Sequence, residues 1–307
     1  MLSFVCALGL VATEARAQNE PQSDVATFVL ANKELAPAAI GVDDKSVYWI
    51  ANYRSAINKV SKGGGAVTTL VDYQNGIRRM IVDKGFIYFL TNDDIRRVPT
   101  AGGKATILVK FADVGASESV YWYIALDNQN VYFVSGPASR QQIFKVGKGG
   151  GKPQALVRVG IPSGLTADGV NVYWVEYAEG MVKKVPVAGG ASVEVGKCER
   201  AGAGALIVDS TNVYCAEAEG KVLRLAKSNG AAETIANVEQ ASFDQLAVDE
   251  RSVYALSLLK GIYRIDKSGG PPLRLVFLDR VAAHFAIDDK NLYWSNYDEG
   301  TVSRRPK

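Results

Sequence analysis

A short phrase, a tyrosine flanked by apolar residues, recurs along the chain at a nearly constant interval. Its seven copies are Val47-Tyr48-Trp49, Ile87-Tyr88-Phe89, Val131-Tyr132-Phe133, Val172-Tyr173-Trp174, Val213-Tyr214-Cys215, Val253-Tyr254-Ala255 and Leu292-Tyr293-Trp294. Successive tyrosines are separated by 40, 44, 41, 41, 40 and 39 residues. A fixed period of this length indicates one supersecondary unit that repeats and packs on its neighbours. The repeat therefore limits the chain to a repetitive architecture over most of its 307 residues.

Each repeat predicts four short strands. The first is an apolar stretch that ends in an aspartate five residues before the tyrosine, and this aspartate suits a tight turn because its carboxylate accepts bonds from nearby amides. The second contains the tyrosine and is rich in β-branched and aromatic residues. The third, for example "AINKV", alternates apolar and polar residues, and the glycines before the fourth favour a two-residue hairpin turn. Four antiparallel strands per repeat of this length are typical of β-propeller blades.

The last repeat lacks its fourth strand, because the chain reaches Lys307 directly after the third-strand piece "TVSRR". Residues 24–32, "DVATFVLAN", match the fourth-strand pattern and precede the first repeat. We therefore expect the N-terminal segment to complete the last blade and close the ring, which leaves no open seam. The prediction is an all-β chain, with residues 24–307 forming one β-propeller of seven four-stranded blades; six blades is the alternative.

The strand ending in Asp, the Tyr-Trp strand, the "I.KV" strand and the glycine turn together resemble the YWTD propellers of the low-density-lipoprotein-receptor type and TolB-like propellers. They look most similar to uncharacterised exported bacterial propellers. YWTD rings have six blades, whereas seven repeats are present here. The Thr-Asp half of the motif is also absent after Trp49, Trp174 and Trp294. The resemblance implies the fold, and no receptor-like mode of ligand binding is carried over from it.

The N-terminus has the pattern of a secretory signal peptide over residues 1–17. An apolar run from Leu2 to Ala12 is followed by Ala15-Arg16-Ala17, a small-x-small cleavage site. We expect an extracytoplasmic protein, periplasmic or secreted. A lipid anchor on Cys6 and a disordered apolar N-terminus on a cytosolic protein are the alternatives. No other stretch is apolar for long enough to span a membrane.

Cys198 and Cys215 would be the cysteines left after cleavage. In an exported chain they are compatible with one disulfide, and two unrelated small apolar residues are the alternative. Lys and Arg number 35 against 32 Asp and Glu, a net charge of +3 that is too small to indicate nucleic-acid binding.

In a propeller the starts of the first strands surround the central channel, and the repeat register predicts which residues lie there. In three of the seven repeats, small residues occupy both positions, four and five before the aspartate. The departures from this rule are the candidate ligand-binding residues at the channel mouth: Arg78, Arg79, Trp122, Tyr123, Asp244, Gln245 and His284. The alternative is a partly solvated channel mouth that each blade fills in its own way.

A second candidate set lies in the loops between second and third strands, which we expect on the same face as the channel mouth. These ligand-binding candidates are Tyr53, Asp93, Glu176, Tyr177, Tyr297 and Asp298. The glycine turns should lie on the opposite face, with Lys62, Lys104, Lys148, Lys152, Lys227 and Lys267. The expected molecule is bipolar, acidic on one face and basic on the other, and such a field steers charged partners.

The expected function is therefore that of a non-enzymatic binding or scaffold propeller, monomeric and without a cofactor, that recognises a protein, peptide or glycan on its loops. The alternative is a metal-dependent hydrolase or lyase of the propeller-lactonase kind. His284 is the sole histidine, and Asp244 is its nearest acidic candidate. A metal site requires several converging ligands, so we assign neither a metal site nor a catalytic residue.

Overall fold

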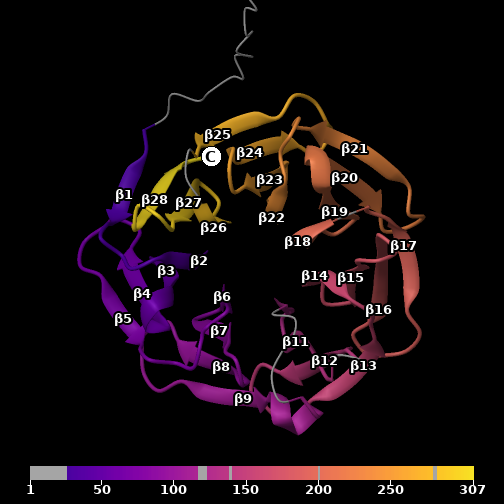
Figure 1. Cartoon of the computed structure of the whole chain (residues 1–307), viewed down its shortest axis with the longest axis horizontal. Helices are drawn as coiled ribbons and strands as arrows, with labels where there is room; N and C mark the ends of the chain where they lie inside the picture. The colour runs from indigo at the N-terminus through magenta and orange to yellow at the C-terminus, as the bar shows by residue number, and fades with distance from the viewer. Residues whose placement is uncertain (1–25, 117–122, 138–139, 200, 279–281) are drawn as a thin grey trace, which may run out of the picture.

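The computed structural model describes residues 26–307, apart from 117–122, 138–139, 200 and 279–281. These residues form seven four-stranded antiparallel sheets arranged as a ring around a central axis (Figure 1). The seven-bladed prediction is confirmed, and the six-bladed alternative is wrong. Within the described ranges, no helix is long and apolar enough to cross a membrane. The proposed signal peptide lies outside the described residues.

The innermost strand of each blade faces the axis, and the other strands follow outward in chain order (Figure 1). The innermost strands are β2 (Pro37–Val42), β6 (Arg79–Asp83), β10 (Ile124–Leu126), β14 (Pro162–Ala167), β18 (Ala201–Val208), β22 (Phe243–Val248) and β26 (Ala282–Ile287). The second strands are β3 (Ser46–Ala51), β7 (Phe86–Leu90), β11 (Asn130–Ser135), β15 (Asn171–Glu176), β19 (Asn212–Glu217), β23 (Ser252–Ser257) and β27 (Asn291–Asn296).

The third strands are β4 (Ala56–Ser61), β8 (Asp94–Pro99), β12 (Gln142–Gly147), β16 (Met181–Pro186), β20 (Lys221–Ala226), β24 (Gly261–Asp266) and β28 (Thr301–Pro306). The outermost strands are β5 (Thr68–Val71), β9 (Thr106–Lys110), β13 (Gln154–Arg158), β17 (Val193–Lys197), β21 (Ala232–Asn237), β25 (Leu273–Phe277) and β1 (Phe28–Ala31). Short 3-10 helices are η1 (Asn52–Arg54), η2 (Phe111–Val114) and η3 (Ala218–Gly220).

The ring is closed as the repeat pattern predicts. β1 pairs antiparallel with β28, so the N-terminal segment is the outer strand of the last blade (Figure 1). Leu30 and Ala31 of β1 are buried, and they pack with Trp49 of the first blade and Val302 of the last. The closing strand therefore joins the two ends of the ring through both hydrogen bonds and apolar packing.

The hydrophobic core is divided among the boundaries between blades. One cluster, for example, joins Tyr173 and Val175 of the fourth blade to Val213 and Leu225 of the fifth. The second strands supply most of the bulk because both of their faces are covered by neighbouring blades, and Trp49 is fully buried. This explains why the repeated phrase is apolar on both sides of its tyrosine instead of alternating in polarity.

The repeated aspartate closes the turn between the first two strands, as expected. In the first blade, Asp43 Oδ1 accepts hydrogen bonds from the backbone N–H groups of Lys45 and Ser46, both at 2.8 Å, and Oδ2 accepts one from the Tyr48 hydroxyl at 2.7 Å. The same three bonds recur at Asp127, Asp168, Asp209, Asp249 and Asp288. The repeated Asp and Tyr are therefore accounted for by the architecture.

The turns between third and fourth strands differ from the prediction in length. The first runs over residues 62–67, six residues instead of two, although Gly64 and Gly65 have the expected positive φ of 87° and 115°. The lysine that begins most of these turns reaches back to the preceding blade. Its ammonium pairs with the turn aspartate there at 2.5–2.7 Å in Lys62–Asp288, Lys148–Asp83, Lys227–Asp168, Lys267–Asp209 and Lys307–Asp249.

The lysine of each pair also lies over the ring of that aspartate's tyrosine; Lys267 is 5.5 Å from the ring centroid of Tyr214. We call this three-residue unit the Asp–Tyr–Lys clasp. The clasps revise the expected basic face, because Lys62, Lys148, Lys227 and Lys267 are each neutralised by a carboxylate. Lys104 and Lys152 remain exposed.

Candidate functional site

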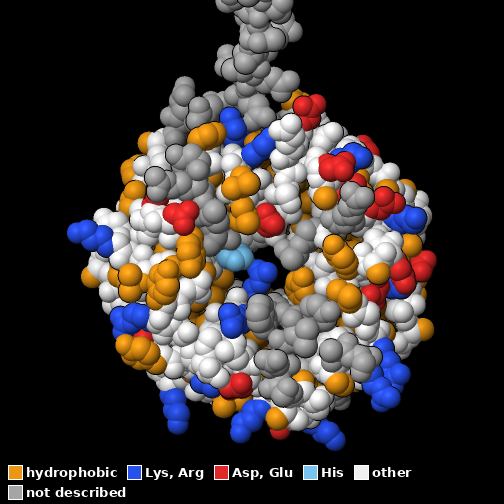
Figure 2. Space-filling view, in the orientation of Figure 1, with side chains coloured by type: hydrophobic (Ala, Val, Ile, Leu, Met, Phe, Trp, Pro, Cys, Tyr) orange, Lys and Arg blue, Asp and Glu red, His pale blue; other side chains and the backbone are white. Residues whose placement is uncertain are grey.

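The central channel contains a cavity of about 460 Å³ lined by residues of all seven innermost strands or their immediate starts. Its polar side chains are Arg79, Tyr123, Gln245 and His284 near the first-strand starts, with Thr166 and Asp83 further along. The first strands start on the face that carries the loops between second and third strands and the connections from one blade to the next. We call this the loop face. Figure 2 shows the single histidine at the edge of the central opening, with Lys or Arg side chains beside it.

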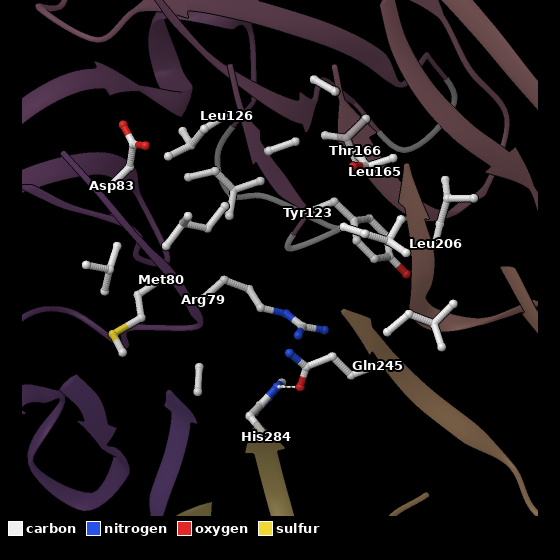
Figure 3. A pocket seen from close by; sticks show the side chains of 18 of the residues that line it. Arg79, Met80, Asp83, Tyr123, Leu126, Leu165, Thr166, Leu206, Gln245 and His284 are labelled. Carbon is white, nitrogen blue, oxygen red and sulfur yellow. Dashed lines mark hydrogen bonds between the residues drawn. The ribbon is translucent and has the colours of Figure 1, made fainter. Parts of the chain in front are cut away.

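The structure divides the seven predicted channel-mouth residues by their strand position. Arg79, Tyr123, Gln245 and His284, four residues before the turn aspartate, line the cavity (Figure 3). Arg78 and Asp244, one position earlier, are not among the lining residues. Trp122 lies outside the described residues.

Arg78 and Asp244 interact with the loops of their own blades. Arg78 Nε donates to Asn92 Oδ1 at 2.9 Å. The Asp244 carboxylate accepts a bond from the backbone of Leu258, while burial raises its pKa. The pairing of β22 with β23 is irregular at this point, between Phe243 and Gln245. The two residues therefore shape the rim of the loop face and do not enter the channel.

Gln245 connects the sixth blade to the seventh and orients His284. Its Nε2 donates to the Phe285 carbonyl at 2.8 Å, and its Oε1 accepts from the Phe285 N–H at 3.0 Å. These two bonds fix which end of the amide is oxygen. The same Oε1 lies 3.3 Å from His284 Nδ1, so Nδ1 carries the proton and Nε2 keeps its lone pair.

His284 is uncharged at neutral pH. Burial within the ring, reinforced by the positive charge of Arg79, lowers its pKa from 6.5 to about 3. Burial likewise lowers the pKa of Arg79, although a guanidinium stays protonated in proteins. Figure 3 shows the Arg79 guanidinium directed toward Gln245 and His284, with Tyr123 approaching the same space. Among the described residues that line the channel mouth, the charge is therefore that of one guanidinium, beside a neutral imidazole.

No carboxylate in the described part of the chain forms an ion pair with Arg79. Several other partly buried cations do have a carboxylate partner. Arg96, for example, donates to Asp94 at 2.7 Å, and Lys267 pairs with Asp209 at 2.7 Å. Uncompensated charge inside a ring of strands is unfavourable, which makes Arg79 a candidate for contact with an anion.

The loop candidates fall into an exposed set and one buried exception. Tyr53 and Tyr177 are 74% and 57% exposed, and Asp93 and Asp298 are exposed as well. Tyr297 is partly exposed and shares a hydrogen bond with Tyr53, which raises the pKa of the Tyr297 phenol. These side chains are accessible on the loop face, where the repeat register placed them.

Glu176 differs from the prediction, because it is the last residue of β15 and is buried. Its carboxylate accepts bonds from the Trp174 indole at 2.8 Å and from the Gly160 backbone N–H at 3.1 Å. Both partners belong to the protein's own framework. Glu176 therefore holds the entrance to its blade together and is not presented to a ligand.

Sequence reasoning missed a group of large apolar side chains on the loop face. Leu259 is 76% exposed in the loop of the sixth blade, and Tyr73 is 79% exposed in the connection between the first and second blades. Leu35 and Ile161 occupy two further connections between blades and are also exposed. The available signal was an apolar residue isolated among polar loop residues, at positions that the repeat alignment does not compare.

Cys198 and Cys215 form a disulfide. Cys198 follows the outer strand of the fourth blade, and Cys215 lies in β19 of the fifth, so the bond fastens this blade boundary. Both residues are fully buried. The sequence left open whether the two cysteines are linked, and in the structure they are linked.

Across the described ranges, no group of three or more His, Cys, Asp or Glu side chains is arranged to hold a metal ion. His284 and Asp244, the two residues considered for such a site, lie in different environments: His284 lines the channel, whereas Asp244 interacts with a loop. The polar chemistry of the channel mouth is thus that of one guanidinium, an amide, a phenol and a neutral imidazole.

No protein-family model matches the chain, and no curated protein matches it in sequence. Several solved structures share its fold. Virginiamycin B lyase from Staphylococcus aureus matches with a TM-score of 0.72 and 13% identity, over 92% of this chain and 99% of that chain. BamB from Moraxella catarrhalis matches with a TM-score of 0.62 and 14% identity, over 88% and 85% of the two chains.

A chain of the nidogen/laminin complex matches with a TM-score of 0.53 and 19% identity, over 66% of this chain and 80% of that chain. The chain is a seven-bladed β-propeller. The resemblance to YWTD-like and other propellers is thereby confirmed for the fold. At these identities the comparison extends no further than the fold.

Proposed function

We propose that this β-propeller is a binding protein whose loop face takes a protein or peptide segment with basic and apolar side chains. The observation that carries the proposal is the uneven distribution of exposed apolar side chains. Large exposed apolar residues on a folded surface indicate interaction sites when they gather on one face. Here they gather on the face that also holds the channel mouth.

The exposed large apolar residues fall into three groups. On the loop face they are Leu35, Tyr53, Tyr73, Ile161, Tyr177 and Leu259. On the outer strands they are Phe28, Val29, Ile107, Val193 and Phe277. On the opposite face, the described residues contribute Val67 and Val170. Tyrosine is favoured at interfaces because its ring covers a large area while its hydroxyl keeps a hydrogen-bonding partner.

The charges around these residues define the partner. Asp93, Asp298 and Glu299 are exposed on the loop face, and Glu299 with Tyr53 lines a shallow pocket of about 380 Å³ between the last and first blades. An acidic surface attracts a basic partner and speeds its association. Among propellers of similar fold, nidogen was solved in a complex with laminin, which supports a binding role for this one.

A peptide display library tests the proposal, with binding of selected peptides measured by fluorescence polarisation. We expect enrichment of peptides that contain Lys or Arg next to aromatic or aliphatic residues. The triple variant Tyr53→Ser, Tyr177→Ser, Leu259→Ser should bind them at least about tenfold more weakly, since truncated interface anchors typically cost 1 kcal/mol or more each. The control triple, Ile107→Ser, Val193→Ser, Phe277→Ser, removes comparable apolar area from the outer strands and should bind normally.

Equal loss in both triple variants would overturn the assignment to the loop face. Binding to a glycan array without any peptide enrichment would overturn the class of partner. Binding by the two variants is compared only if thermal melting shows that both are as stable as the parent.

Export is part of the same proposal. The Cys198–Cys215 disulfide supports it, since such bonds persist mainly in oxidising compartments. Mass spectrometry of the protein recovered from its native source should find a mature chain that begins at Gln18. A chain that retains residues 1–17, recovered from the cytosol with reduced cysteines, would contradict export.

A catalytic role is the second candidate, because virginiamycin B lyase has the same fold and the channel of this chain contains a histidine. A catalytically inactive variant of that lyase was solved with quinupristin. Incubation of quinupristin with this protein, followed by chromatography, compares the two roles. The binding proposal expects quinupristin to be recovered unchanged, and turnover that is lost in His284→Ala would replace it.

A further inference from the structure

We propose that the mouth of the central channel binds the anionic head group, carboxylate or phosphate, of a small ligand, with the Arg79 guanidinium as its charge partner. The inference goes beyond the proposed function and does not depend on it, since a small anion occupies the channel whether or not a peptide binds on the loops. It rests on the charge, the geometry and the size of the cavity.

The charge argument starts from Arg79. Its side chain is directed into the cavity, and no described carboxylate pairs with it. A guanidinium presents a planar fork of N–H donors that matches two oxygens of a carboxylate or phosphate. An anion that enters from the loop face would therefore supply the counter-charge that the described residues do not provide.

The neighbours of Arg79 are suited to orient an anion without repelling it. His284 is uncharged, and Gln245 is held in place by its two bonds to Phe285, so neither side chain has to reorganise. The Tyr123 phenol approaches the same space (Figure 3). Asp244 does not line the cavity, and Asp83, the described carboxylate that does, lies four residues after Arg79 along β6 and pairs with Lys148 at 2.5 Å.

The size of the cavity sets the class of ligand. At the same strand position three other blades have the small residues Ala39, Gly164 and Ala205, of which Ala39 lines the cavity. Beyond the polar mouth, the walls are apolar and include Ile124, Leu165 and Leu246. About 460 Å³ accommodates a small molecule and not a folded domain. The cavity thus fits an anionic head attached to a short apolar body.

The single histidine makes the test direct, because His284 gives the protein one imidazole C2–H resonance and that resonance reports from inside the channel. The protein is prepared with a tag that contains no histidine. Sodium butyrate and sodium phosphate are the two anionic probes, and butyramide is the uncharged match of butyrate. We expect a saturable shift with one or both anions and no saturable shift with butyramide, and comparing the two anions identifies the head group.

The variant Arg79→Met removes the charge and keeps the length of the side chain. It should weaken binding of the active probe by at least about tenfold, or ~1.4 kcal/mol. Arg78→Met is the matched control, because Arg78 is adjacent in sequence but bonds Asn92 outside the cavity. It should leave the affinity within about twofold, the ordinary effect of a distant surface substitution.

Three results would overturn the inference: no saturable shift with either anion, equal shifts with butyramide, or unchanged affinity in a folded Arg79→Met protein. Loss of loop-face peptide binding would leave this result untouched, so the failure of either proposal is recognised separately. Where Arg79→Met is unstable, Arg79→Lys keeps the charge but not the planar fork, and it should bind more weakly than the parent.

Discussion

The charge state of His284 is set by its surroundings. The ring of strands removes water from the imidazole, the Arg79 guanidinium adds an unfavourable like charge, and Gln245 holds the neutral tautomer through Nδ1. Burial and the like charge of Arg79 both disfavour protonation, so the folded protein binds a proton at this site less readily than the unfolded chain does. Because the chain has a single histidine, this difference in proton binding should be measurable as a change of stability with pH.

The folded pKa of about 3 lies below the unfolded value of 6.5, so stability should fall as the pH drops from 6.5 toward 3. One proton limits the slope to about 1.4 kcal/mol per pH unit. Urea unfolding at pH 6.5, 5.75 and 5.0 should show this loss in the parent and a flat profile in His284→Gln. Burial raises the pKa of Asp244, which acts in the opposite direction, but equally in both proteins. Parallel profiles would contradict the assignment.

Neighbouring blades are joined by Lys–Asp ion pairs that recur from one blade boundary to the next. In the clasp on Asp209, for example, the aspartate accepts bonds from two backbone amides and a tyrosine hydroxyl of its own blade, and then from the lysine of the next blade. Burial would raise the pKa of Asp209, but the bonds from Lys267, the amides and Tyr214 together lower it. The ionised carboxylate is therefore the stabilised form, and the clasps weaken only below the ordinary aspartate range.

Lys267→Met should lower the free energy of unfolding by about 1–2 kcal/mol, because it removes a charge-assisted bond between groups that are largely shielded from water. The measurement is chemical denaturation at pH 7. Lys104→Met, an exposed lysine in another glycine turn with no ion pair among the described residues, is the control and should change little. Equal effects would mean that the clasp contributes nothing beyond general charge.

Two blade boundaries have the aspartate but not the lysine. The residue that corresponds to Lys267 is Thr100 beside Asp43 and Val187 beside Asp127. Thr100→Lys should complete the clasp on Asp43 and raise the melting temperature by a few degrees, in line with about 0.5–1 kcal/mol. The pair Thr100→Lys, Asp43→Asn tests the contact, since the gain should disappear when the carboxylate is removed.

The disulfide fastens one boundary covalently. Its loop spans 17 residues, for which the chain-entropy model gives about 3 kcal/mol. A reductant should therefore lower the melting temperature of the parent, whereas the variant Cys198→Ala, Cys215→Ala should melt at the lower temperature with or without it. A parent that melts identically under both conditions would show that the bond does not stabilise the fold.

The whole molecule depends on its closing strand, because the ring is stable only when the last boundary is sealed like the others. β1 provides the side chains that cover this boundary on the outside, with Leu30 directed inward and Val29 outward. Without it, β28 would become an open edge next to an exposed apolar surface.

Leu30→Asp should therefore destabilise the protein by at least ~3 kcal/mol, since it places an unpaired carboxylate in the packed boundary. Val29→Asp, one residue away on the same strand but 57% exposed, is the matched control and should be nearly neutral. Urea denaturation measures both, and limited proteolysis shows whether β1 is released first. Equal stability of the two variants would contradict closure by β1.

The blade repeat was predictable because its signals are local. The turn aspartate, the β-branched second strand and the positive-φ glycines each act within a few residues, and the missing fourth strand pointed to residues 24–32. The channel candidates were predictable in part. Arg79 and His284 line the cavity, whereas Arg78 bonds Asn92 and Asp244 accepts from the backbone of Leu258, and such loop contacts are not visible in the repeat pattern.

By itself, the sequence determined the number of blades, their strands and the way the ring closes, since these follow from periodicity and turn chemistry. Only the tertiary structure decided which charged side chains remain accessible at the surface. Lys62 pairs with Asp288, 226 residues away in the sequence, and the Glu176 carboxylate accepts hydrogen bonds from Trp174 and Gly160. Neither Lys62 nor Glu176 is therefore available to a ligand. Arg79 remains without a carboxylate because no acidic side chain among the described residues converges on it when the seven first strands meet at the axis.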